Sequence, residues 1–156
     1  MAVRYVDGMD VTDSSFDSEV LDRSHEVPVV VDFWASWCGP CLALGPVLEQ
    51  AVAERSDPVE LVKVDVDANQ ELAARFGVSG IPAVKAFRDG RVAEEFVGAL
   101  SPTAVSAFLD RLLAPPRADA LLGELRATGE LADVVAAVDA GATEQALALI
   151  VAAVAA

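Results

Sequence analysis

Basic residues are scarce in this chain of 156 residues. It has 11 Lys and Arg against 25 Asp and Glu, and its formal net charge at pH 7 is -14. Nucleic acids and anionic membranes bind to basic surfaces, because both carry a dense negative charge. The charge balance therefore argues against both classes of partner, and we expect that the protein binds neither nucleic acid nor membranes.

Metal-binding side chains are also few. The sequence contains two cysteines and one histidine, His25. A structural zinc site needs four such ligands, so one chain of this composition does not supply a complete set. We expect no bound metal, and we expect His25 to be a solvent-facing spacer, because no other residue pairs with it in a catalytic pattern.

Long apolar runs are missing as well. The most apolar segment, residues 145–156, falls well short of the roughly 20 residues that a membrane-spanning helix needs. Residues 1–13 mix charged and apolar side chains and contain no stretch of signal-peptide type. We therefore expect a cytoplasmic protein. Thiols are kept reduced in that compartment, so a close pair of cysteines there usually has a catalytic role.

The two cysteines lie in the segment Trp-Cys-Gly-Pro-Cys at residues 37–41. A β-branched apolar run ends just before this segment and helical apolar spacing begins just after it, so a strand leads here into a helix. The first N–H groups of a helix are unpaired and carry the positive end of its dipole, which favours a thiolate at Cys38. Cys41 follows one turn later on the same face, while Gly39 and Pro40 suit the first helical turn. The pattern predicts that Cys38 attacks and Cys41 resolves.

An inert structural disulfide is the alternative interpretation of the same pair. A disulfide stabilises a protein mainly by constraining the unfolded chain, and a loop this short removes little entropy from it. The spacing is therefore more typical of a pair that alternates between dithiol and disulfide.

One acidic residue, Asp32, interrupts the apolar strand predicted over residues 29–34. A buried strand gives a carboxylate little water, so burial should raise the pKa of Asp32. Its place near the end of the strand makes it a candidate to exchange a proton with Cys41. In the next predicted strand, Lys63 lies among apolar residues, and two interpretations stay open: Lys63 neutralises Asp32, or it reaches solvent.

Alternating strand and helix patterns predict an α/β fold with a central sheet between helices. We expect a first helix that is capped by Asp13 or Ser14 and ends at Ser24, and a hairpin that turns at Asp89-Gly90. The predicted strands cover residues 4–6, 29–34, 59–66, 83–87 and 91–97. One predicted helix begins within residues 37–41, is kinked near Pro46 and ends at Ala53, and two later helices cover residues 70–76 and 102–114.

This order of elements resembles the thioredoxin family, and the residues carry the resemblance further. The segments that match the family are residues 31–41 with the Cys-Gly-Pro-Cys motif, Pro46, 64–67, 80–82 with Gly-Ile-Pro, and 97–99. The resemblance implies the thioredoxin fold, a mixed sheet flanked by helices, for residues 1–114.

The resemblance also implies roles for single residues. Cys38 corresponds to the nucleophile of the family, Cys41 to its resolving thiol, and Asp32 to its buried proton-transfer carboxylate. Lys63 corresponds to the lysine that faces this carboxylate, and Pro82 to the cis-proline that lies against the disulfide.

An apolar rim that receives protein substrates is implied too. It consists of Trp37, Gly80, Ile81, Gly98 and Ala99, with the backbone around Ile81 pairing with a substrate segment. The sequence departs from the family at Leu42, where many relatives carry a basic residue. This change removes a positive charge beside the thiolate and favours apolar clients.

The activity implied by the resemblance is protein disulfide reduction by thiol exchange, with electrons from thioredoxin reductase and no bound cofactor. Its clients would be disulfide-bearing or unfolded proteins. The alternative is a holdase or co-chaperone, with chaperones as partners, that binds unfolded clients through the apolar groove and uses its cysteines for capture. The pair Cys38 and Cys41, together with Asp32 and Pro82, favours the enzyme, because capture needs only one reactive cysteine.

Beyond Pro115-Pro116 the composition shifts to Ala, Leu and Val, which predicts a small all-α tail over residues 115–156. Its predicted helices cover residues 117–128, 130–140 and 143–156. Residues 140–147 resemble part of a tetratricopeptide repeat, a module that is fused to thioredoxin domains in some co-chaperones. A stable stack needs about three repeats. Three arrangements therefore stay open: a tail packed on its own domain, a dimer contact, or a truncated repeat array.

Overall fold

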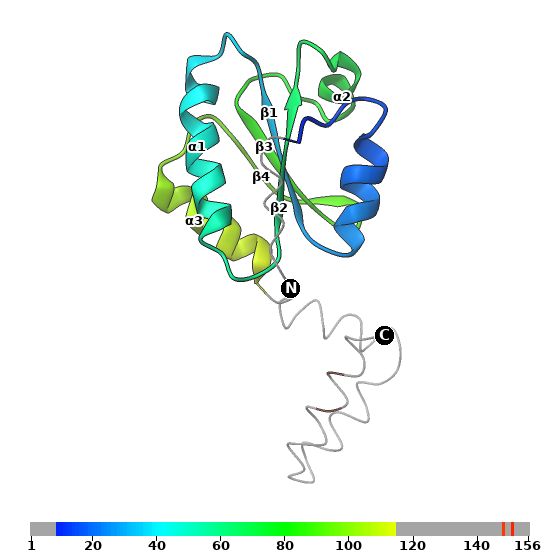
Figure 1. The fold of residues 1–156 in the computed structure, drawn as a ribbon, viewed down its shortest axis with the longest axis vertical. Helices are drawn as coiled ribbons and strands as arrows, with labels where there is room; N and C mark the ends of the chain where they lie inside the picture. The colour runs from blue at the N-terminus through cyan, green and yellow to red at the C-terminus, as the bar shows by residue number, and fades with distance from the viewer. Residues whose placement is uncertain (1–8, 115–147, 149–150, 152–156) are drawn as a thin grey trace. The chain divides into compact units, whose positions relative to one another are not determined.

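A computed structural model describes residues 9–114 together with Ala148 and Val151. Four strands form one mixed sheet in the order β2-β1-β3-β4 (Figure 1). The strands are β1 (Val29–Trp34), β2 (Glu60–Asp65), β3 (Ala83–Arg88) and β4 (Arg91–Val97). β1 runs parallel to β2 and antiparallel to β3, and β4 runs antiparallel to β3. The predicted α/β class is confirmed.

Helical elements cover both faces of this sheet (Figure 1). On one face lie α1 (Gly39–Ala53) and α3 (Pro102–Leu113); on the other lie the π-helical turn η1 (Asp17–Asp22), the 3₁₀ turn η2 (Arg23–His25) and α2 (Gln70–Arg75). None of the helices within residues 9–114 is both long and apolar enough to cross a membrane.

The alternation of side chains along β1 divides the interior into two cores. Val30 packs with Leu44 and Leu48 of α1, whereas Val29 and its odd-numbered neighbours pack on the opposite face. That opposite core is aromatic and includes Phe16, Phe33 and Phe87, with Phe76 packed against them. Because Asp32 has the same parity as Val30, the sheet directs its side chain toward the α1 face.

The chain before η1 runs along the outer edge of β2. Val11 N–H donates to the carbonyl of Lys63 at 2.8 Å, and Lys63 N–H donates to the carbonyl of Met9 at 3.2 Å. The strand predicted at residues 4–6 lies outside the described residues, as do the predicted helices of the tail and the repeat-like segment 140–147. The division of the chain into a domain over 1–114 and a tail over 115–156 stays a prediction.

The hairpin between β3 and β4 turns where the sequence predicts it. Asp89 and Gly90 have φ values of 52° and 75°, the left-handed conformation that a two-residue hairpin turn requires. The buried Ser24 secures this turn, because its hydroxyl accepts a hydrogen bond from Gly90 N–H at 2.8 Å.

Asp13 does not cap the first helix as predicted. Phe16 precedes η1 without a side-chain cap, and the carboxylate of Asp13 instead accepts a hydrogen bond from Leu72 N–H at 3.0 Å, in the first turn of α2. Asp13 N–H in turn donates to Asn69 Oδ1 at 3.0 Å. The side chain of Asn69 itself makes no capping bond, so the cap of α2 comes from a residue far away in the sequence.

Replacing Asp13 with alanine should lower the free energy of unfolding by about 1–2 kcal/mol, because α2 loses its side-chain cap. Urea unfolding followed by circular dichroism measures this loss. Asp17→Ala is the matched control, since Asp17 lies in an exposed ion pair with Arg75 and should change stability by less than about 0.5 kcal/mol. Equal losses in the two variants would contradict the assignment of the cap.

Candidate active site

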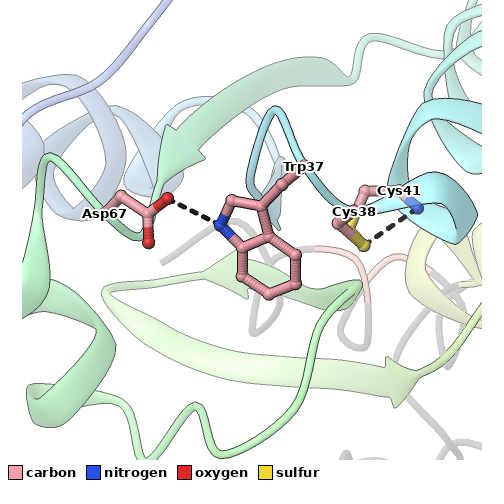
Figure 2. Close-up of a disulfide and its surroundings, with 4 residues drawn as sticks. All are labelled: Trp37, Cys38, Cys41 and Asp67. Atoms are coloured by element: carbon pink, nitrogen blue, oxygen red, sulfur yellow. Dashed lines mark hydrogen bonds between the residues drawn. A yellow bond between two sulfur atoms is a disulfide. The ribbon is translucent and has the colours of Figure 1, made fainter.

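The two cysteines lie at the start of α1 and are joined by a disulfide. Cys38 occupies the N-cap position, and the Cα atoms of Cys38 and Cys41 are 5.3 Å apart. Cys41 N–H donates to Cys38 Sγ at 3.2 Å (Figure 2). This hydrogen bond to sulfur would also stabilise a thiolate once the disulfide is reduced.

The first turn of α1 leaves the helix dipole unopposed. Its residues are Gly39, Pro40, Cys41 and Leu42, none of which carries a charge. Gly39, Pro40 and Leu42 are exposed, while both cysteines are buried. The positive end of the dipole therefore acts on Cys38 without a competing acidic side chain from the first turn of α1.

Apolar side chains pack around the disulfide. Cys38 and Cys41 form a buried cluster with Ala35, and Ile81 packs against it together with Trp34 and Val66. The two cysteines are therefore largely shielded from solvent, at 4% and 3% exposure.

The loop before β3 contributes Ile81 to this cluster. The Ile81–Pro82 peptide bond is cis, and the carbonyl of Pro82 accepts a hydrogen bond from Gly98 N–H at 2.8 Å. The structure thus brings Ile81, Pro82 and Gly98 together. Gly80 and Ala99 are exposed, and the place of each in a substrate rim stays a prediction.

Trp37 is held at the surface beside the disulfide. Its side chain is 69% exposed, and its indole Nε1 donates to Asp67 Oδ2 at 2.8 Å. Figure 2 shows the ring between Asp67 and the two cysteines. Asp67, which the sequence analysis does not assign to the site, thereby fixes the orientation of a large apolar surface.

Val97 is an exposed apolar residue that the sequence analysis does not assign to the substrate rim. It is 71% exposed, and a Cβ atom placed on Gly80 would lie 3.9 Å from its Cγ1. Val97 therefore extends the apolar surface next to Gly80. The break in alternation at the end of β4, just before Gly98, is the sequence signal that could have identified it.

Asp32 is buried in the centre of the sheet. The residue is 1% exposed, and its Oδ1 atom has no hydrogen-bond partner among the described residues. Burial raises the pKa of Asp32 to about 6; the positive charge of Lys63 opposes this rise and the negative charge of Glu49 adds to it. A carboxyl group with a pKa of about 6 suits proton exchange with a thiol, because the efficiency of a general base is greatest when its pKa lies near the working pH.

Lys63 faces Asp32 from the adjacent strand but makes its ion pair elsewhere. The two residues are direct register partners of β1 and β2. Lys63 Nζ lies 3.1 Å from Glu49 Oε1 of α1, and it lies 5.7 Å from the centroid of the Trp34 ring. The sequence left open whether Lys63 neutralises Asp32 or reaches solvent. In the structure Lys63 pairs with Glu49 instead, a partner that the sequence analysis does not consider.

Comparison with known proteins agrees with this geometry. The family model described as Thioredoxin matches residues 8–111. The chain is 43% identical over 103 residues to Thioredoxin 1 of Synechococcus elongatus, covering 66% of this chain and 94% of that protein. It is 42% identical over 102 residues to the thioredoxin of Pseudomonas aeruginosa, covering 65% of this chain and 93% of that protein.

A mycobacterial relative gives the same result. The thioredoxin of Mycobacterium tuberculosis is 46% identical over 95 residues, which cover 61% of this chain and 80% of that protein. The family match ends at residue 111, so it lends no support to a repeat-like tail or a co-chaperone role. Over its matched region, the chain belongs to the thioredoxin family and is a thiol–disulfide oxidoreductase of the protein-disulfide reductase type.

Proposed function

We propose that this protein works in the reducing direction in the cytoplasm, accepting electrons from thioredoxin reductase and passing them to disulfides of client proteins. The observation that carries the proposal is the Cys38–Cys41 disulfide at an uncharged helix start, next to the exposed ring of Trp37. A nucleophile, a resolving group and a docking surface are then present at one site.

In the first step, the Cys38 thiolate attacks one sulfur of a client disulfide. A new S–S bond forms between Cys38 and the client, and the other client sulfur leaves as a thiolate. The helix dipole favours the attacking thiolate, and the N–H of Cys41 stabilises negative charge on the Cys38 sulfur.

In the second step, the sulfur of Cys41 attacks Cys38 Sγ and releases the client as its second thiolate. Cys41 must lose its proton for this attack, and Asp32 is the acceptor in our proposal, because its carboxyl group is largely ionised at pH 7 with a pKa of about 6. Two electrons have then moved from the protein to the client, and the Cys38–Cys41 disulfide is restored.

Clients would bind to the apolar rim. Trp37 and Ile81 offer apolar surface beside the disulfide, and Val97 adds apolar surface next to Gly80. The exposed Leu42 stands where many relatives carry a positive charge. We therefore propose that the client segments next to the target cysteine are apolar rather than acidic.

The test is reduction of insulin disulfides by the full chain with NADPH and thioredoxin reductase. We expect NADPH consumption that depends on the protein concentration. If the reductase fails to reduce the protein while dithiothreitol succeeds, the proposed electron source is wrong. If neither reductant supports insulin reduction, the proposed direction is wrong.

Cys41→Ser should trap the intermediate of the first step. Without a resolving thiol, the mixed disulfide between Cys38 and the client persists, so a covalent complex should accumulate. Dithiothreitol should separate this complex by reducing the disulfide. Non-reducing electrophoresis followed by mass spectrometry detects it. The double variant Cys38→Ser/Cys41→Ser is the control and should trap nothing; equal trapping by both would contradict the assignment of Cys38 as nucleophile.

A further inference from the structure

Three charged side chains from three elements meet on the α1 face of the sheet. They are Asp32 of β1, Lys63 of β2 and Glu49 of α1. Asp32 and Lys63 are register partners on neighbouring parallel strands, so their side chains leave the sheet on the same face. Asp32 would be the expected partner for the Lys63 ammonium group, because a buried carboxylate is costly without a counter-ion.

The Lys63 ammonium group contacts Glu49 instead. The Nζ–Oε1 distance is 3.1 Å, with the side chains 23% and 33% exposed. A Cβ atom placed on Gly45 would lie 3.4 Å from Nζ, so the bare backbone of α1 at Gly45 leaves room for the ammonium group. Gly45 and Glu49 are one helical turn apart, and Lys63 thus extends along α1 toward Glu49.

This arrangement leaves Asp32 without a fixed partner. Oδ1 of Asp32 accepts no hydrogen bond from any described residue. Its other strand neighbour, Val84 of β3, is apolar and belongs to the core cluster that also contains Val105 and Phe108 of α3. The charged groups that act on Asp32 in the described part of the chain are Lys63 and Glu49.

We propose that Glu49 is a positioning residue that draws the Lys63 ammonium group away from Asp32 and so leaves the buried carboxyl group free to gain and lose a proton. The inference rests on the proposed function, since thiol exchange at Cys41 is the step that would use this proton. Glu49 touches no reacting atom and acts through Lys63.

The direct test is the titration of the Asp32 carboxyl carbon by ¹³C NMR in the oxidised full chain, where the cysteines do not titrate. Glu49→Gln keeps the size of the side chain but removes its charge, so Lys63 should turn to Asp32 and stabilise the carboxylate. We expect the ratio of protonated to ionised Asp32 at a given pH to fall roughly threefold or more. An unchanged or higher ratio would overturn the inference.

Glu54→Gln is the matched control, because Glu54 follows the same helix, is exposed, and pairs with Gln50 rather than with the site. It removes the same charge from the protein. An effect as large as that of Glu49→Gln would mean that Asp32 responds to net charge alone, and the inference would fail.

Removing Lys63 separates positioning from direct repulsion. In a Lys63→Met background, with Lys63→Gln as the substitute if folding is impaired, Glu49→Gln should have a clearly smaller effect on Asp32 than in the unaltered chain. Equal effects in both backgrounds would show that Glu49 acts on Asp32 directly, which would contradict the proposal.

The titration and the activity assay test the two proposals separately. Loss of insulin reduction by the unaltered chain would remove the proposed function and leave the titration behaviour of Asp32 intact. If Glu49→Gln left the titration of Asp32 unchanged, this inference would be wrong, and the result of the reductase assay would still stand.

Discussion

Replacing Cys38 with serine is expected to reduce insulin turnover at least ~10³-fold, to the rate seen without the protein. A serine hydroxyl cannot form a disulfide, so the first bond-forming step is lost rather than slowed. The N-cap geometry should survive, because a serine oxygen is itself a favoured N-cap acceptor for the N–H groups of α1. The measurement is NADPH consumption in the reductase-coupled assay.

Two observations keep this result interpretable. Circular dichroism and urea unfolding of Cys38→Ser should match those of the reduced unaltered chain. The variant Cys41→Ser carries the same chemical change one helical turn later, and it should still form a mixed disulfide in a single turnover. Residual turnover by Cys38→Ser above background would show that Cys41 or another group is the attacking thiol.

Replacing Asp32 with asparagine should stabilise the oxidised protein at neutral pH. The pKa of Asp32 is raised to about 6 in the folded state, from 3.8 without the fold. The folded state therefore binds the proton more tightly than the unfolded state does. Ionisation of the carboxyl group destabilises the fold, and this destabilisation increases as the pH rises from about 4 to about 6 and is constant at higher pH. The gain in Asp32→Asn should approach about 3 kcal/mol at pH 8 and vanish below about pH 4.

Urea unfolding of the oxidised protein between pH 4 and pH 8 measures this dependence. Asp57→Asn, which changes an exposed aspartate, should not reproduce it. A stability difference between Asp32→Asn and the unaltered chain that stays flat across this range would mean that Asp32 has an ordinary proton affinity in the folded protein. Its assignment as proton acceptor for Cys41 would then lose its physical basis.

The parts of the site that are local in sequence could be predicted from it. Residues 37–41 are read correctly because an apolar strand ends and a helix begins within a few residues, which fixes Cys38 at the helix start. Asp32 could be predicted as buried for the same reason: its neighbours on both sides are apolar and belong to one strand. The hairpin turn at Asp89-Gly90 follows from two residues that tolerate a left-handed backbone.

The parts that depend on how elements pack against each other could not be predicted. Glu49 meets Lys63 because α1 crosses the sheet at one particular rotation, and no short-range pattern encodes that rotation. Asp13 illustrates the same limit: its position before an apolar run is typical of a local N-cap, but a tertiary contact with α2 prevails. The pairing of Trp37 with Asp67 likewise joins two loops that only the sheet brings together.

The two outer strands of the sheet differ in how they meet their surroundings. At the edge of β2, the backbone N–H and carbonyl of Lys63 are hydrogen-bonded to Met9 and Val11. A further strand cannot pair with β2 at this position. β4 is the other border, and its side chains include Arg91, Glu94 and Glu95. Charges on such a strand repel lateral association. These features disfavour edge-to-edge pairing of sheets between copies of this protein, and so disfavour fibre formation at high concentration.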